Sequence, residues 1–267
     1  MIRVANAPVS YGAFEQTVGA LPNVPAAPVV LDAIAAAGYE GTELGPYGYF
    51  GTGDALHRAL DERGLALAGA FVELDFAAGE LSPLDATLDL LTPYDAQPVL
   101  ADCGPRDGDV DLDGVRRAVE LARDRGHEPV FHHHMGTRVQ TPSEIERLLG
   151  GTDVALLLDT GHLTAGGGDP VQALRDWAPR VRHVHLKDVS RAVIEHARDW
   201  GDAWRNGAFC ELGTGDVDLL GFFAALAGYD GWIVVEQDWF PAEGEDAAEH
   251  VAAQVRNREW LRTRVGV

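Results

Sequence analysis

The sequence is poor in cysteine. Its 267 residues include only Cys103 and Cys210, which lie far apart and form no CxxC motif. Two cysteines are too few for a disulfide framework, and without CxxC spacing they do not indicate a zinc or redox centre built on thiolates. We therefore expect a chain that works in the reducing cytoplasm.

Basic residues and long apolar runs are also scarce. The chain has 21 Lys and Arg residues against 42 Asp and Glu residues, a formal net charge of −21. Such a field repels nucleic acid and anionic membrane surfaces, so we expect neither as a partner. The sequence lacks the run of about 18 apolar residues that spans a bilayer. Residues 1–12, "MIRVANAPVSYG", lack the basic and apolar regions of a secretion signal. The sequence predicts neither secretion nor membrane insertion.

What the chain does have is a regular alternation of strand and helix patterns. The predicted strands cover residues 2–9, 40–45, 65–72, 97–102, 129–134, 154–159, 181–188 and 232–238. The predicted helices cover residues 29–38, 54–64, 83–93, 112–126, 143–150, 170–179, 217–228 and 247–264. Eight such units favour a (β/α)₈ TIM barrel, with one domain over residues 1–267. A doubly wound open sheet is the alternative.

Polar residues end most of the predicted strands. Because chemistry in such a barrel collects at the carboxyl ends of the strands, these positions form the candidate site. They are Glu43, Asp102, His132 to His134, Asp159, His185 and Glu236.

Two of these strand ends carry several polar residues at close spacing. In "VALLLDTGH", Asp159 ends an apolar run and His162 follows on the turn; the alternative is a capping aspartate and a structural loop histidine. In "VRHVHLKD", alternation places His183, His185 and Lys187 on one face of the strand. These patterns predict a polar inner wall.

The strand patterns at "FHHHM" and "WIVVEQD" point the same way. Alternation puts His132 and His134 on one face and turns His133 toward the surrounding helices. Glu236 and Asp238 share a face after an apolar run, and the alternative is that they form salt bridges inside the barrel with Lys187 or an arginine. One strand-five histidine, Asp159, His185 and Glu236 would together form a mixed nitrogen and oxygen set, which suits Mn²⁺, Co²⁺, Fe²⁺ or Zn²⁺ better than Ca²⁺.

Several motifs resemble a known family. They are "APVSYG", "AGYEGTELGPYGY", "DTGH", "HVHLKD", "GTGDVD" and "GYDGWIVVEQD". They resemble the xylose isomerase-like barrels of the sugar isomerase, epimerase and endonuclease IV superfamily, and within it most closely the inosose dehydratases. The likeness covers nearly the whole chain. The DNA-cleaving members carry extra zinc-binding histidines, and Phe209 and Cys210 supply none here.

The resemblance implies a ligand set and a reaction. The implied metal ligands are His132, Asp159, His185 and Glu236, with His134 as the alternative to His132. Mn²⁺ or Co²⁺ is the favoured ion, and Zn²⁺, Fe²⁺ and Mg²⁺ are alternatives. The implied activity is a metal-dependent dehydration of an inosose, a cyclic keto-polyol, through an enolate. A keto-sugar isomerase or epimerase and a binding protein without activity are the other hypotheses.

Catalytic roles follow from the chemistry of that reaction. The candidates are Glu43, His134, His162, Lys187 and Glu236. We expect Glu236 or Glu43 as base, His134 or His162 as acid, and Lys187 to position oxygens. A structural alternative for Glu43 is pairing with a residue of the first or third strand.

Two further segments have open interpretations. Residues 45–53, "GPYGYFGTG", predict either a lid carrying Tyr47, Tyr49 and Phe50 or an ordinary turn on the barrel rim. Residues 191–209 hold two tryptophans and predict either a wall of the pocket or a contact in a homo-oligomer.

Overall fold

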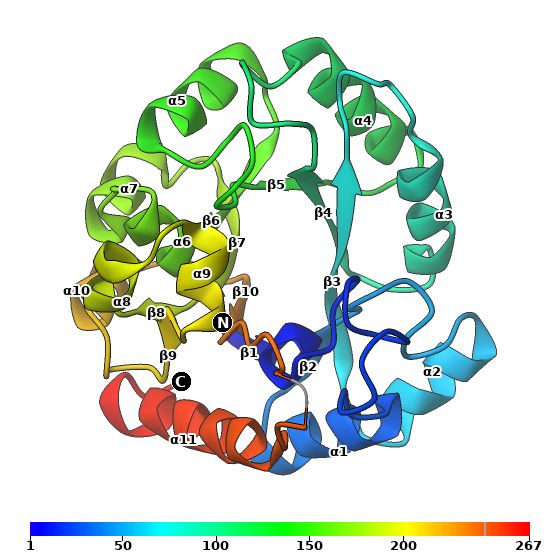
Figure 1. The fold of residues 1–267 in the computed structure, drawn as a ribbon. Helices are drawn as coiled ribbons and strands as arrows, with labels where there is room; N and C mark the ends of the chain where they lie inside the picture. Colours follow the sequence, from blue (N-terminus) through cyan, green and yellow to red (C-terminus); the bar gives the residue numbers. More distant parts are fainter. Residues whose placement is uncertain (243) are drawn as a thin grey trace.

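Eight parallel strands close into a barrel, and helices surround it (Figure 1). This computed structural model describes residues 1–242 and 244–267. The barrel strands are β1 (Arg3–Asn6), β2 (Gly41–Glu43), β3 (Ala66–Leu74), β4 (Gln97–Asp102), β5 (Val130–His132), β6 (Ala155–Asp159), β7 (Val181–Leu186) and β10 (Trp232–Val235). They follow one another around the ring in chain order, and β10 pairs with β1 to close it. The predicted TIM barrel is confirmed, and the open sheet is wrong.

One helix follows each barrel strand on the outside, as predicted. These helices are α1 (Ala27–Ala37), α2 (Asp54–Asp61), α3 (Ser82–Leu91), α4 (Leu112–Asp124), α5 (Pro142–Gly151), α7 (Pro170–Trp177), α10 (Leu219–Ala225) and α11 (Ala248–Arg264). The last helix, α11, lies beside α1 and completes the ring (Figure 1).

The prediction of one strand and one helix per unit was incomplete at the carboxyl end of the barrel. Additional short elements follow three of the strands there. They are a 3₁₀ helix η1 (Pro8–Tyr11), helices α6 (Thr160–Ala165), α8 (Arg191–His196) and α9 (Trp200–Arg205), and an antiparallel pair of strands, β8 (Asp188–Val189) and β9 (Phe209–Cys210). Elements this short do not carry enough turns for an apolar period to show in the sequence.

Local sequence signals explain where the ring helices begin and end. Gly38 ends α1, and Gly228 ends the segment after α10. Their φ angles of 85° and 87° are in the left-handed region, which residues with a side chain disfavour. At the start of α5, the Glu144 carboxylate accepts hydrogen bonds from the backbone amides of Gln140 and Thr141 at 2.9 and 2.8 Å. These amides would otherwise lack partners.

Apolar residues fill the lower part of the barrel interior and leave the carboxyl end polar. The interior clusters consist of Ala5, Ala7, Ala68, Trp232 and Val234, and of Val99, Val130, Ala155 and Leu157. Because side chains alternate along a strand, the residue two positions after an inner residue also points inward, one layer nearer the carboxyl end. That layer holds the predicted site. No helix in the described part of the chain is long and apolar enough to cross a membrane.

Candidate metal and active site

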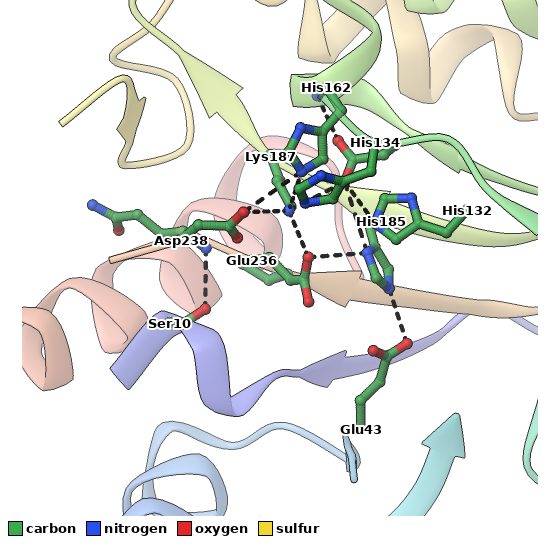
Figure 2. A network of polar contacts seen from close by, with 12 residues as sticks. Ser10, Glu43, His132, His134, His162, His185, Lys187, Glu236 and Asp238 are labelled. Atoms are coloured by element: carbon green, nitrogen blue, oxygen red, sulfur yellow. Dashed lines mark hydrogen bonds and ion pairs between the residues drawn. The ribbon is translucent and has the colours of Figure 1, made fainter. Parts of the chain in front are cut away.

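Four predicted ligands converge at the carboxyl end of the barrel, and Figure 2 labels His132, His185 and Glu236 among them. His132 ends β5, Asp159 ends β6, His185 lies on β7, and Glu236 follows β10. Asp159 Oδ2 lies 3.8 Å from His132 Nε2 and 3.7 Å from His185 Nδ1. Glu236 Oε2 lies 2.9 Å from His185 Nδ1. All four side chains are buried, and their strands are neighbours on one side of the ring.

Two of these facing atoms lack hydrogen bonds. Asp159 Oδ2 and His185 Nδ1 are buried and have no hydrogen-bond partner among the described residues. The other oxygen of Asp159 accepts a hydrogen bond from the His162 amide at 2.7 Å and caps α6. The capping alternative for Asp159 is therefore confirmed, and its other oxygen remains free to serve as a ligand. Asp159 Oδ2 and His185 Nδ1 face each other without a well-aligned hydrogen bond, although Lys187 Nζ lies 3.2 Å from the first and Glu236 Oε2 lies 2.9 Å from the second. Imidazole and carboxylate groups of this kind fit a transition-metal ion.

The electrostatic field at His185 also favours a cation. Burial opposes a charge on this ring, but the carboxylates of Glu236 and Glu43 raise the pKa of His185 well above its ordinary value. A field that holds a proton on the ring also attracts a metal ion to Nδ1. Asp159 is ionised: burial opposes its charge, but Lys187 and His185 hold its pKa well below the usual range.

Glu43 lies behind His185. One of its oxygens, Oε1, is 2.9 Å from His185 Nε2 and 2.9 Å from His183 Nε2. The expected partner on the first or third strand is wrong, because Glu43 pairs across the barrel with β7. A carboxylate can only accept, so His185 donates through Nε2 and presents Nδ1 to Asp159 and Glu236. In metalloproteins, a carboxylate that accepts from one ring nitrogen commonly orients a histidine whose other nitrogen binds the metal, and Glu43 and His185 have this arrangement.

Lys187 lies in the middle of the acidic groups, as Figure 2 shows. Its Nζ is 2.8 Å from Glu236 Oε2, 2.8 Å from Asp238 Oδ2 and 3.2 Å from Asp159 Oδ2. The alternative of salt bridges inside the barrel is therefore also present. Three carboxylates around one ammonium leave an excess of negative charge. Two of them, Glu236 and Asp159, are also among the four predicted metal ligands. Burial raises the pKa of Asp238 to about 7, with Lys187 opposing and Glu236 adding to the rise.

The three consecutive histidines have three different surroundings. His132 faces Asp159 and His185 inside the barrel. His133 is fully buried, but its Nε2 accepts a hydrogen bond from the Asp159 amide at 3.1 Å, so it supports β6 rather than only facing helices. His134 lies past the end of β5, and its Nδ1 is 2.8 Å from the Met135 carbonyl oxygen. Of the two alternatives for the ligand position, the geometry favours His132.

His162 lies on helix α6 and not on a turn. Its Nε2 is 3.2 Å from Lys187 Nζ, and its ring centroid is 3.8 Å from that of His134. It is buried and does not line the cavity, whereas His134 does. Asp102, which ends β4, is also removed from the cavity, because its two oxygens bind the Arg138 guanidinium at 2.7 and 2.9 Å.

A cavity of about 150 Å³ opens above the converging residues. The Trp204 side chain of α9 lines it, and Phe209 packs 4.9 Å from Lys187 Nζ. Residues 191–209 thus contribute to the pocket wall. Only Gly45 and Pro46 of residues 45–53 reach the cavity. Tyr49 donates to the Pro25 carbonyl oxygen and Phe50 is buried, which favours the alternative of an ordinary turn on the barrel rim over that of a lid.

Several residues that line the cavity were not predicted from the sequence. Glu73 follows Phe71 with the alternation of an inward strand face, but the predicted strand stopped at residue 72. A longer strand prediction would have found Glu73. Glu15 and Phe14 come from the loop after β1, where no strand period marks them.

Comparisons with known proteins identify the family of this chain and its fold. A family model described as the xylose isomerase-like TIM barrel matches residues 107–264. An inosose dehydratase of Bacillus thuringiensis (strain Al Hakam) is 39% identical over 164 residues, which are 58% of this chain and 54% of that protein. The chain thus spans about half the length of the curated relatives that it matches.

Two solved structures share the whole barrel. The probable 3-DHS dehydratase AsbF involved in petrobactin synthesis from Bacillus anthracis has a TM-score of 0.73 and 16% identity, covering 99% of this chain and 100% of that one. The IolI protein with a binding zinc atom has a TM-score of 0.66 and 13% identity, covering 97% and 96%. At these identities they show the fold alone. The family model, which covers more than half of the chain, confirms the resemblance seen in the motifs: the chain belongs to the xylose isomerase-like TIM barrel family.

Proposed function

We propose that the protein is a metal-dependent dehydratase of a cyclic keto-polyol of the inosose type. The observation that carries the proposal is the convergence of His132, Asp159, His185 and Glu236 beneath a cavity, where Asp159 Oδ2 lies 3.8 Å from His132 Nε2 and 3.7 Å from His185 Nδ1. The names of the curated relatives, inosose dehydratases, support the substrate class.

These four residues would hold a divalent ion. Mn²⁺ or Co²⁺ suits the two imidazoles and two carboxylates, with Zn²⁺, Fe²⁺ and Mg²⁺ as alternatives. When bound, the ion supplies a Lewis acid that stabilises negative charge on a substrate carbonyl oxygen. Glu43 would fix His185 for this role and is less suited to act as a base, because its Oε1 already accepts from two imidazoles.

His134 is the best placed group for proton transfer. Its Nδ1 donates to the Met135 carbonyl oxygen, so in the neutral ring Nε2 keeps a lone pair. That ring lines the cavity. We assign it both halves of the elimination: Nε2 takes the proton next to the carbonyl and returns it to the departing hydroxyl, which leaves as water. Glu236 stays the alternative base, and Lys187 and His162 position these groups.

The experiment offers the Mn²⁺- or Co²⁺-loaded protein an inosose in D₂O. We expect loss of water and the ultraviolet absorbance of a conjugated enone, the enol form of a cyclic 1,2-dione. Deuterium uptake at carbon without dehydration would instead select a keto-sugar isomerase or epimerase, which shares the same first proton transfer. Metal binding without either reaction would contradict an enzymatic role.

A pair of variants separates the roles of neighbouring histidines. His134→Gln should lower kcat by about 10²- to 10⁴-fold, the usual contribution of a general base or acid, and keep the metal affinity. His132→Gln should lose the metal. The reverse pattern would exchange their roles.

A further inference from the structure

Two carboxylates at the mouth of the cavity have no part in the ligand cluster. Glu15 comes from the loop after β1 and Glu73 from β3, and both line the cavity. We call them the mouth carboxylates. The described residues provide neither with a salt-bridge partner. Both side chains are exposed. Partial desolvation at the cavity raises the pKa of Glu15, and the charge of Glu73 adds to the rise. Partial desolvation also raises the pKa of Glu73.

The cavity has little positive charge to offset them. Among the described residues that line it, Lys187 is the one Lys or Arg side chain. Its ammonium is already held by three carboxylates at 2.8 to 3.2 Å. Even a divalent ion and Lys187 together supply three positive charges, against five from the mouth carboxylates, Glu43, Asp159 and Glu236, and Asp238 adds part of a sixth because its pKa is about 7. An anionic group on a substrate would find no free counter-charge here.

Aromatic side chains form the remaining wall. Phe14, Phe71 and Trp204 line the cavity. Phe14 lies 5.1 Å from Trp204 between ring centroids, and the Trp204 indole donates to the Asp238 carbonyl oxygen at 3.1 Å. These contacts hold the wall in place. A ring of carbons bearing hydroxyls matches such a cavity, because its C–H faces pack on aromatic rings and its hydroxyls donate to carboxylates.

We propose that Glu15 and Glu73 determine the charge specificity of this site: they accept hydrogen bonds from the hydroxyls of an uncharged ring and exclude analogues that carry a carboxylate or phosphate. This inference rests on the proposed function only for placing a polyol ring in the cavity.

Calorimetric binding of two unreactive rings tests it. The metal-loaded protein is titrated with myo-inositol, which is neutral, and with quinate, a cyclic polyol that carries a carboxylate. We expect quinate to bind at least about tenfold more weakly, which corresponds to about 1.4 kcal/mol. The deficit should shrink when NaCl rises from about 50 to about 500 mM, because salt screens exposed charges.

Glu73→Gln and Glu15→Gln should each raise quinate affinity relative to inositol, and the double variant should remove most of the deficit. Glu120→Gln is the matched control, since it removes the same charge from a position on α4 that does not line the cavity, and it should change the affinity of neither ligand.

The outcomes separate the two proposals. If the mouth variants leave the ratio unchanged, or the control shifts it equally, the charge-specificity proposal is wrong. If inositol binds with the predicted pattern but no inosose reacts, only the proposed function fails. If the metal-loaded wild-type protein neither binds inositol nor reacts with an inosose, both fail.

Discussion

Glu43 determines which nitrogen of His185 faces the cavity. Its Oε1 accepts from His185 Nε2, so Nδ1 stays available toward Asp159 and Glu236. Because burial opposes its charge but His185 and His183 hold its pKa far below the ordinary value, Glu43 stays ionised. An ionised carboxylate behind a ligand histidine makes that ligand a stronger donor to a metal.

We therefore predict that Glu43→Gln lowers the affinity for Mn²⁺ or Co²⁺ by about 10- to 100-fold, the usual effect of such outer partners. Competition against a coloured chelator measures it. Glu73→Gln makes the same chemical change in the same cavity without touching His185, so it should leave the metal affinity unchanged. Equal affinities in wild type and Glu43→Gln would show that Glu43 does not support the ligand.

At the scale of elements, one buried aspartate holds the segment that follows β7. Asp188 accepts four backbone hydrogen bonds, from Val189, Gly213, Gly215 and Val217, at 2.8 to 3.1 Å. This ties the "HLKD" and "GTGDVD" motifs together and holds β8 and β9. Phe209 of β9 in turn packs over Lys187. Asp188 thus helps to hold Phe209 in place against Lys187 at the carboxyl end of the barrel.

Asp188→Asn replaces one acceptor oxygen by an amide donor, so amides on that side lose their partner. We predict a loss of about 2 kcal/mol or more in the free energy of unfolding, since each buried donor left unpaired costs about 1–3 kcal/mol. Urea unfolding measures this, and hydrogen exchange should speed up at Gly213 and Gly215. Asp169→Asn, at the exposed start of α7, should change little because asparagine caps helices equally well. Similar losses in the two variants would refute the special role of Asp188.

Among the strands and helices, some features could be predicted from the sequence and others could not. Strand ends were predictable because β-alternation and the repeated strand-helix order fix which residues meet at the carboxyl edge; Asp159 and His185 were found in this way. Helix α6 and helices α8 and α9 were not, because six residues carry too little period. The Glu43 contact with β7 was also missed, because it joins strands that are not neighbours in the ring and no linear pattern records such a contact.

The whole barrel divides into two halves with different chemistry. Strands β5, β6, β7 and β10 are consecutive in the ring and supply the four residues proposed as metal ligands. The other half, β1 to β4 and the loop after β1, supplies Glu15, Glu43, Phe71 and Glu73. A metal held by the four proposed ligands would join neighbouring strands of a closed barrel, so its binding should stabilise the folded chain.

This coupling gives a prediction for the whole molecule. A ligand that binds only the native state stabilises it by about 2.7 kcal/mol at 100 times its Kd. For a domain of this size we expect the Tm to rise by about 5–10 °C with Mn²⁺ or Co²⁺ and to fall again with a chelator. Asp159→Asn should abolish the shift without unfolding the protein, because the asparagine oxygen can still cap α6 at the His162 amide. Glu15→Gln, outside the ligand set, should keep the shift. A shift of equal size in Asp159→Asn would place the stabilising ion elsewhere and would remove Asp159 from the ligand set.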